Sequence, residues 1–154
     1  SQEVASLFLI NIAGPVEQKL SVTSFTAPKF SEFGPIPFSV DYKNEGNVHM
    51  KPAGVISVTD VLGRKIADVP VTATNVFPQA SRIVKVNWNE RLLVGPFVAT
   101  AILYTNGKGN ETVSMTTSFF VFPVRIAVIL LIVIFLILRF RKRITKAVQA
   151  LAGK

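Results

Sequence analysis

Residues 36–43 have the sequence IPFSVDYK, in which large apolar side chains alternate with small or polar ones. Successive side chains of a β-strand point to opposite faces, so Phe38, Val40 and Tyr42 would share one side of an extended chain. One face of this segment suits a hydrophobic core and the other suits water. The pattern therefore predicts a half-buried β-strand.

The same alternation recurs before Pro123, in runs rich in Val, Ile, Thr and Phe that are separated by Gly, Pro and Asn. The predicted strands cover residues 7–12, 20–25, 36–43, 54–60, 65–71, 82–88, 97–104 and 113–122. No segment before Pro123 has a helical period. Many short, closely spaced strands predict an all-β fold, an immunoglobulin-like β-sandwich over residues 1–122.

Side-chain faces and turns follow from the same pattern. The expected core-facing groups also include Val84, Val86 and Trp88 on one strand and Met115, Phe119 and Val121 on another. Residues 61–64 (VLGR) and 105–110 (TNGKGN) carry the Gly and Asn that tight reversals need, so each segment should close a hairpin. Residues 1–15 are either a strand of this sandwich or a remnant strand or linker from an upstream domain.

The net charge of +8 and a pI near 10.1 are unevenly distributed along the chain. All acidic residues lie at or before Glu111, and basic and acidic residues nearly cancel up to Val124. The excess of positive charge flanks one apolar run and consists of Arg125, Arg139, Arg141, Lys142, Arg143, Lys146 and Lys154. A near-neutral N-terminal domain lacks the basic footprint of a nucleic-acid-binding protein, so no nucleic-acid partner is expected.

The apolar run itself, residues 126–138, has the sequence IAVILLIVIFLIL. As a helix it is about 20 Å long, shorter than a hydrocarbon core of about 30 Å. Residues 119–124 (FFVFPV) and Phe140 lengthen it, and Arg125 is close enough to one end to reach the interface. Because a helix that is apolar on every face cannot be buried in so small a domain, we predict a transmembrane helix over residues 123–140.

Basic residues directly after the run set the expected topology. Arg139, Arg141, Lys142, Arg143 and Lys146 have no acidic residue near them, which places this side in the cytoplasm and the N-terminal domain outside. Together with Arg125 they are the predicted membrane-interface residues, and the lipid bilayer is an expected partner. Residues 141–154 form either an amphipathic cytoplasmic helix or, from Ala147 onward, a frayed tail.

The chain contains no cysteine, which excludes disulfides, thiolate metal sites and a cysteine nucleophile. An exported domain without disulfides fits a bacterial surface protein better than a eukaryotic one. The chain starts at Ser1 without an initiator Met or an export segment. This topology therefore predicts a processed or truncated N-terminus.

Few residues suggest chemistry. The single His49 cannot build a multi-histidine metal site, and a structural role is favoured over ligand contact. Asn44 and Asn47 are turn residues first, and for Arg82 packing over Trp88 is favoured over recognition of a partner. These residues, Asn44, Asn47, His49 and Arg82, are the possible partner-binding positions. We expect no catalytic residue, no metal and no cofactor, and hence no enzyme.

A longer pattern combines Asn44-x-Gly46-Asn47-x-His49-x-x-Pro52-x-Gly54, Phe77-Pro78-x-x-Ser81-Arg82, Trp88, Gly95, Tyr104, an apolar helix and a basic tail. From about Leu7 onward it resembles the membrane-proximal part of bacterial cell-surface proteins akin to the WxL-interacting protein family. The resemblance implies an immunoglobulin-like domain before a C-terminal anchor, with contacts to peptidoglycan or other envelope proteins. It identifies no active site.

Two functions follow as hypotheses. The first is a non-enzymatic, single-pass adhesion module of the bacterial cell envelope that binds a partner protein or cell-wall polymer at the outer membrane face. The alternative is an accessory single-span subunit of a larger membrane assembly, such as a secretion or pilus machine. Helix packing in membranes prefers small residues, and residues 126–138 contain only Ala127, which disfavours the alternative.

Overall fold

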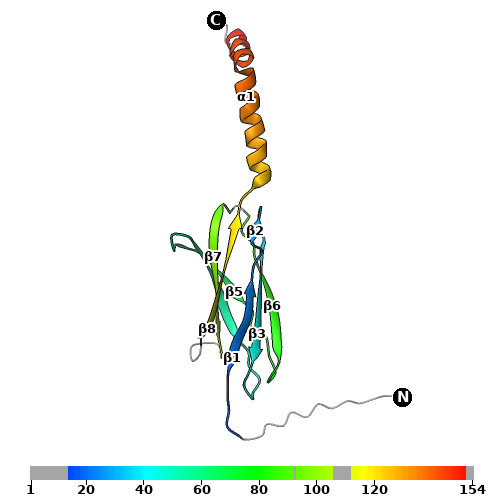
Figure 1. Ribbon diagram of the computed structural model, residues 1–154, viewed down its shortest axis with the longest axis vertical. Helices are drawn as coiled ribbons and strands as arrows, with labels where there is room; N and C mark the ends of the chain where they lie inside the picture. Colours follow the sequence, from blue (N-terminus) through cyan, green and yellow to red (C-terminus); the bar gives the residue numbers. More distant parts are fainter. Residues whose placement is uncertain (1–13, 92, 106–111, 152–154) are drawn as a thin grey trace, which may run out of the picture.

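The structure is a computed structural model that describes residues 14–91, 93–105 and 112–151, with residues 141–151 as backbone only. Strands come first and a helix follows (Figure 1). The elements are β1 (Leu20–Thr26), β2 (Phe30–Ser31), β3 (Ile36–Asn44), β4 (Ala53–Asp60), β5 (Lys65–Val71), β6 (Ser81–Trp88), β7 (Gly95–Tyr104), β8 (Thr112–Val121) and α1 (Val124–Leu151).

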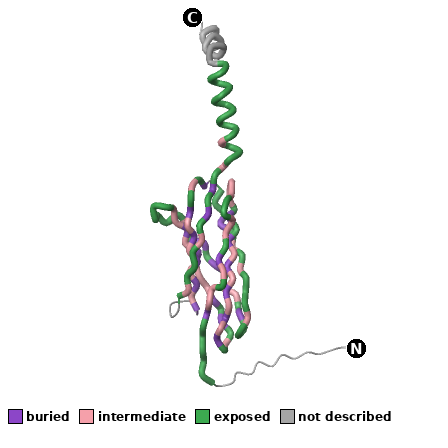
Figure 2. Tube along the Cα trace, in the orientation of Figure 1, coloured by how far each residue is buried: buried purple, intermediate pink, exposed green. Residues whose placement is uncertain are grey.

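The strands form two sheets, one with the order β1-β3-β6 and the other with the order β2-β8-β7-β4-β5. Neighbouring strands are antiparallel, except for the short parallel pair of β2 and β8. Buried residues alternate with more exposed ones along strands of both sheets (Figure 2). The predicted all-β class and its sandwich arrangement are therefore confirmed.

Aromatic rings fill the core between the sheets. Phe38 of β3 is completely buried, and its ring centroid lies 5.7 Å from that of Phe119 on β8 in an edge-to-face arrangement. Trp88 of β6 meets Phe97 of β7 in the same manner at 6.0 Å. Such pairs contribute about 0.5–1.5 kcal/mol each beyond the burial of their area. The contacts join the two sheets, with β3 and β6 on one side and β8 and β7 on the other.

Most predicted strands appear within one or two residues of their expected bounds. The inward positions of Phe38, Val40 and Tyr42 are confirmed, since all three are fully buried. Met115 was wrongly assigned to the core: it is 37% exposed, because β2 covers the free edge of β8 only beside Phe120 and Val121. The sequence did not predict β2, which is too short to show alternation.

The predicted hairpin at residues 61–64 joins β4 and β5 and is confirmed. The Asp60 carboxylate accepts hydrogen bonds from the backbone N–H groups of Leu62 and Arg64, both at 2.9 Å. Gly63 has a φ of 76°, a conformation that glycine adopts without strain. β7 and β8 pair as expected. Most of the turn predicted at residues 105–110, and the strand predicted at residues 7–12, lie outside the described residues.

Helix α1 begins at Val124, directly after Pro123, and projects away from the sandwich (Figure 1). Its backbone is helical through Leu151, which favours a continuous helix over a tail that frays from Ala147. In the described part of the chain, no helix is long and apolar enough to cross a membrane. The transmembrane span over residues 123–140 stays a prediction.

Candidate functional site

Asn44, the last residue of β3, is completely buried, and its amide is used within the fold. The Nδ2 group donates to the carbonyl oxygens of Val48 at 2.8 Å and Val76 at 3.2 Å. The Oδ1 atom accepts the N–H of Gly46 at 2.9 Å. Asn44 therefore holds the chain reversal after β3.

Asn47 fastens the segment before β1 to this reversal. Its Nδ2 group donates to the Pro15 carbonyl at 2.6 Å, and its Oδ1 atom accepts the Glu17 N–H at 2.8 Å. The two segments approach so closely that a Cβ atom on Gly46 would lie 2.2 Å from the Glu17 carbonyl oxygen. Both asparagines thus serve the local structure, and a partner-binding role for them stays a prediction.

His49 and Arg82 are exposed. Within the described residues neither side chain has a hydrogen bond or ion pair. Arg82 lies opposite Tyr42 in the register of β6 and β3. The role favoured for it from the sequence, packing over Trp88, is wrong, because six positions along an extended strand place the two Cα atoms about 20 Å apart.

Tyr42 is the buried titratable group beside Arg82. Burial raises the pKa of its phenol, while a side-chain interaction with Thr74 and the Arg82 charge oppose that shift. Within the described residues the hydroxyl has no hydrogen-bond partner of good geometry. A buried polar group without a hydrogen-bond partner lowers the free energy of unfolding, so the Tyr42 hydroxyl destabilises the core.

Strand β6 forms a regular, open edge of the three-stranded sheet. Among the described strands it pairs only with β3, over eight residues and without a register shift. The other edge of this sheet, β1, has an irregularity between Val22 and Ser24, and the β5 edge contains Pro70. Bulges and prolines discourage the addition of a further strand, so β6 is better suited to pair with one than β1 or β5.

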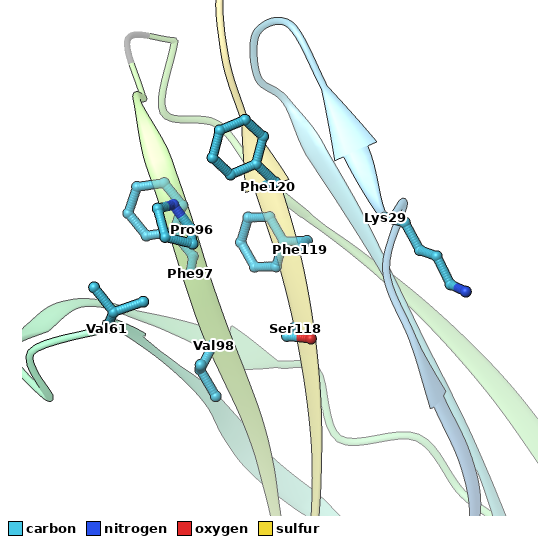
Figure 3. A pocket seen from close by; sticks show the side chains of 8 residues that line it. All are labelled: Lys29, Val61, Pro96, Phe97, Val98, Ser118, Phe119 and Phe120. Carbon is cyan, nitrogen blue, oxygen red and sulfur yellow. The ribbon is translucent and has the colours of Figure 1, made fainter.

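A hollow of about 460 Å³ lies where the outer faces of β7 and β8 meet the β4–β5 turn (Figure 3). Its lining consists of Lys29, Val61, Pro96, Phe97, Val98, Ser118, Phe119 and Phe120. Lys29 is the single charged member of this lining, and its side chain points away from the rings. Lacking a carboxylate or imidazole, the lining offers no pair of groups for acid–base catalysis.

Next to this hollow, three aromatic side chains form an exposed row. The Phe120 ring stacks on Phe30 at 6.2 Å and on Phe122 at 6.3 Å. The sequence analysis did not single out this row. The alternation that buries Phe119 and Val121 places Phe120 and Phe122 on the opposite face, and this signal was present in the sequence.

The row leads directly into α1. The backbone N–H of Phe122 donates to the Ser31 carbonyl at 3.0 Å, and the N–H of Ala127 donates to the Pro123 carbonyl at 3.0 Å. Arg125 in the first helical turn forms a 3.2 Å ion pair with Glu32, which follows β2. The helix is therefore joined to one end of the sandwich through hydrogen bonds and an ion pair, with Pro123 as the connection.

The predicted membrane-interface residues flank the apolar part of α1. Arg125 lies before it, and Arg139 lies after it with its guanidinium 5.9 Å from the Phe140 ring centroid. The side chains of Arg141, Lys142, Arg143 and Lys146 lie outside the described residues. In the described part of the chain, no group of three or more His, Asp or Glu residues is placed to hold a metal ion.

No family model matches the chain, and no curated protein gives a significant match. Among solved structures, the chain is similar to the CARDB domain of the PF1109 protein from Pyrococcus furiosus, solved in complex with di-metal ions. The TM-score is 0.50 at 14% identity, covering 68% of this chain and 88% of that one. At this identity the likeness concerns the fold alone, which is a β-sandwich similar to a CARDB domain.

Two glucosidases also show partial similarity. The β-D-glucoside glucohydrolase from Trichoderma reesei matches with a TM-score of 0.48 and 13% identity, covering 68% of this chain and 19% of that one. The β-glucosidase EmGH1 from Erythrobacter marinus matches with a TM-score of 0.48 and 11% identity, covering 68% and 15%. The chain spans less than a fifth of either glucosidase, and these likenesses carry no argument about activity.

Proposed function

We propose that this chain is a non-enzymatic, single-pass surface module of a bacterial envelope. In this proposal α1 is embedded in the membrane, the immunoglobulin-like sandwich stands on the outer face, and the sandwich binds a partner protein or wall polymer. The observation that carries it is the surface of α1. The large apolar side chains from Val124 to Phe140 are between 38% and 66% exposed.

Such a surface needs a non-aqueous cover. Burial of apolar surface stabilises by about 25 cal/mol for each Å², and this stabilisation is lost where the surface of α1 remains in water. Apolar side chains occupy every position from residue 126 to residue 138, so they surround the helix rather than form one stripe. A protein partner that packs against one face of α1 would leave the other faces in contact with water, whereas lipid contacts all faces of the helix.

The short length of the apolar run must be accommodated. A bilayer thins locally around a short helix at a cost of a fraction of a kcal/mol per Å, and long basic side chains reach out to the headgroups. Arg125 and Arg139 stand at the two ends of the run and can act in this way. The basic residues after Leu138 support a cytoplasmic position for the helix end.

Partner binding is assigned to the open edge of β6. Its unpaired backbone groups can add a strand from another protein, and exposed side chains such as Arg82 and Lys85 would select the partner. The resemblance to WxL-interacting proteins supports an envelope partner. This assignment gives Arg82 a recognition role and leaves His49 outside the main contact.

Two experiments test the proposal. Alkaline extraction of membranes should leave the full chain in the pellet, and release into the supernatant would contradict embedding of α1. A photoreactive residue in place of Lys85 should capture a surface protein or wall fragment in intact cells, while the same residue at the exposed loop position Lys51 should not. Capture of membrane subunits in fixed stoichiometry from positions on α1 would favour the accessory-subunit alternative.

A further inference from the structure

The end of the sandwich that joins α1 carries six exposed apolar side chains from four separate segments. They are Phe30 of β2, Val61 and Leu62 of the β4–β5 turn, Val94 before β7, Phe120 of β8 and Phe122 after it. We call this set the proximal apolar cluster. Leu62 is its most exposed member at 74%.

The strand registers bring these segments to one end of the molecule. Phe30 lies beside Phe120, and Gly95, which follows Val94, lies opposite Val121. Asp60, which precedes the β4–β5 turn, lies opposite Phe97. Phe97 is itself opposite Phe119, so the turn starts at the level of the aromatic row. In Figure 1 this turn projects from the part of the sandwich nearest to α1.

The distance to the apolar part of α1 is short. Ile126 is four positions after Phe122, so the two Cα atoms cannot lie further apart than about 14 Å. The polar zone on each side of a bilayer is only about 5–8 Å deep. A cover on Ile126 therefore lies close to Phe122, the member of the proximal apolar cluster that is nearest to α1 along the chain.

The connection also restricts rotation of the sandwich away from that cover. Phe122 is hydrogen-bonded to β2 through the Ser31 carbonyl, and Arg125 is paired with Glu32. Lys29 and Arg91 are exposed at the same end, and within the described residues neither has an ion pair. These two cations are suited to the phosphates of lipid headgroups.

We propose that the proximal apolar cluster docks on the outer headgroup layer of the bilayer, so that the sandwich lies against the membrane. The docking rests on the proposed function, since it needs α1 in the same bilayer. It adds apolar contacts outside a helix whose uninterrupted apolar run is short. The sandwich then has a fixed height above the lipid, with the opposite end, near Phe77, free for partners.

The absence of cysteine makes site-specific labelling straightforward. The full chain is reconstituted in vesicles of phosphatidylcholine and phosphatidylglycerol, and a single cysteine carries an environment-sensitive fluorophore. The test variant is Leu62→Cys. The matched control is Phe77→Cys, because Phe77 is 72% exposed at the opposite end of the sandwich. A third variant, Leu131→Cys, reports on α1 itself.

Docking predicts a shift of the Leu62→Cys label to shorter wavelength, with strong quenching by lipids spin-labelled near the headgroup. The Phe77→Cys label should show neither change. Quenching of Leu131→Cys by deep spin labels without any quenching of Leu62→Cys would overturn the docking and leave the anchored module intact. No quenching at either position would overturn the proposed function as well.

A protein partner gives a different outcome. If the Leu62→Cys label remains exposed to an aqueous quencher in pure lipid vesicles and becomes protected only when envelope proteins are added, the cluster binds protein and lipid docking is overturned. A double variant, Val61→Ser with Leu62→Ser, provides a second check. It changes only exposed turn positions and should weaken the quenching of a label at Val94→Cys several-fold, with unchanged quenching at Leu131→Cys.

Discussion

Leu103 of β7 is completely buried, whereas Leu131 of α1, the same residue type, is 66% exposed. The sandwich covers its apolar side chains by facing one sheet with the other, as the contacts of Phe38 and Phe119 illustrate. Among the elements that the structure describes, none faces α1 in this way. The sandwich therefore covers its own apolar side chains, whereas in our proposal the bilayer covers those of α1.

The largest expected effect is the difference in stability between alanine substitutions at Leu103 and at Leu131. Leu103→Ala should lower the free energy of unfolding by about 2–5 kcal/mol, because it removes buried methyl groups and leaves a cavity. Leu131→Ala should leave the stability of the sandwich unchanged in detergent. Denaturant unfolding followed by the fluorescence of Trp88, the single tryptophan, measures both variants. Equal losses would show that α1 belongs to the folding unit of the sandwich.

The second effect concerns polar groups inside the sandwich. Asn44→Ala removes a buried amide and leaves the Val48 carbonyl and the Gly46 N–H without this partner. We expect a loss of about 1–3 kcal/mol in the free energy of unfolding. Asn47→Ala, at an exposed position of the same reversal, should cost clearly less. A smaller loss for Asn44→Ala than for Asn47→Ala would contradict a structural role for the buried amide.

Tyr42→Phe should act in the opposite direction and stabilise the sandwich by about 1 kcal/mol, because it removes a buried hydroxyl without a good partner. The folded-state pKa of Tyr42 is raised by burial, so the unfolded chain loses its phenolic proton first. Below about pH 10, the pKa of tyrosine in the unfolded chain, the protonated phenol leaves stability unchanged. As the pH rises from there through the higher pKa of Tyr42 in the folded chain, the free energy of unfolding decreases. Denaturation between neutral and alkaline pH should show a shallower loss for Tyr42→Phe than for the parent chain.

The smallest effect lies at the junction of the two regions. The Arg125 and Glu32 side chains are 82% and 30% exposed, so Glu32→Gln should cost at most about 1 kcal/mol, and less at high salt. Its consequence for orientation should be clearer than its consequence for stability. In spin-label measurements between the sandwich and α1, the distance distribution should broaden in Glu32→Gln. An unchanged distribution would show that the hydrogen bonds at Phe122 and Ala127 fix the junction without the ion pair.

The sequence predicted the sandwich well because alternation is a local signal. Strands β3 to β8 were located within two residues, and Gly63 marked its turn. The prediction was poorer where tertiary context decides. Met115 alternates like a core residue, yet its exposure depends on how far β2 extends along β8. Strand β2 itself is two residues long and has no periodicity to detect.

The candidate site was less predictable from sequence. Asn44 and Asn47 were correctly assigned to a turn, but their partners at Val76 and Pro15 are distant in sequence. The proximal apolar cluster was not foreseen, because its members come from four segments that only the strand registers bring together. The open edge of β6 likewise follows from sheet order, which alternation does not encode.

The central claim, an external sandwich held by a membrane-embedded α1, is tested most directly by labelling sealed cells with a membrane-impermeant maleimide. The chain contains no cysteine, so Phe77→Cys reports on the sandwich and Lys154→Cys on the chain end after α1. We predict labelling of Phe77→Cys in sealed cells and of Lys154→Cys only after permeabilisation. Labelling of both variants in sealed cells, or of Lys154→Cys alone, would contradict the proposed topology.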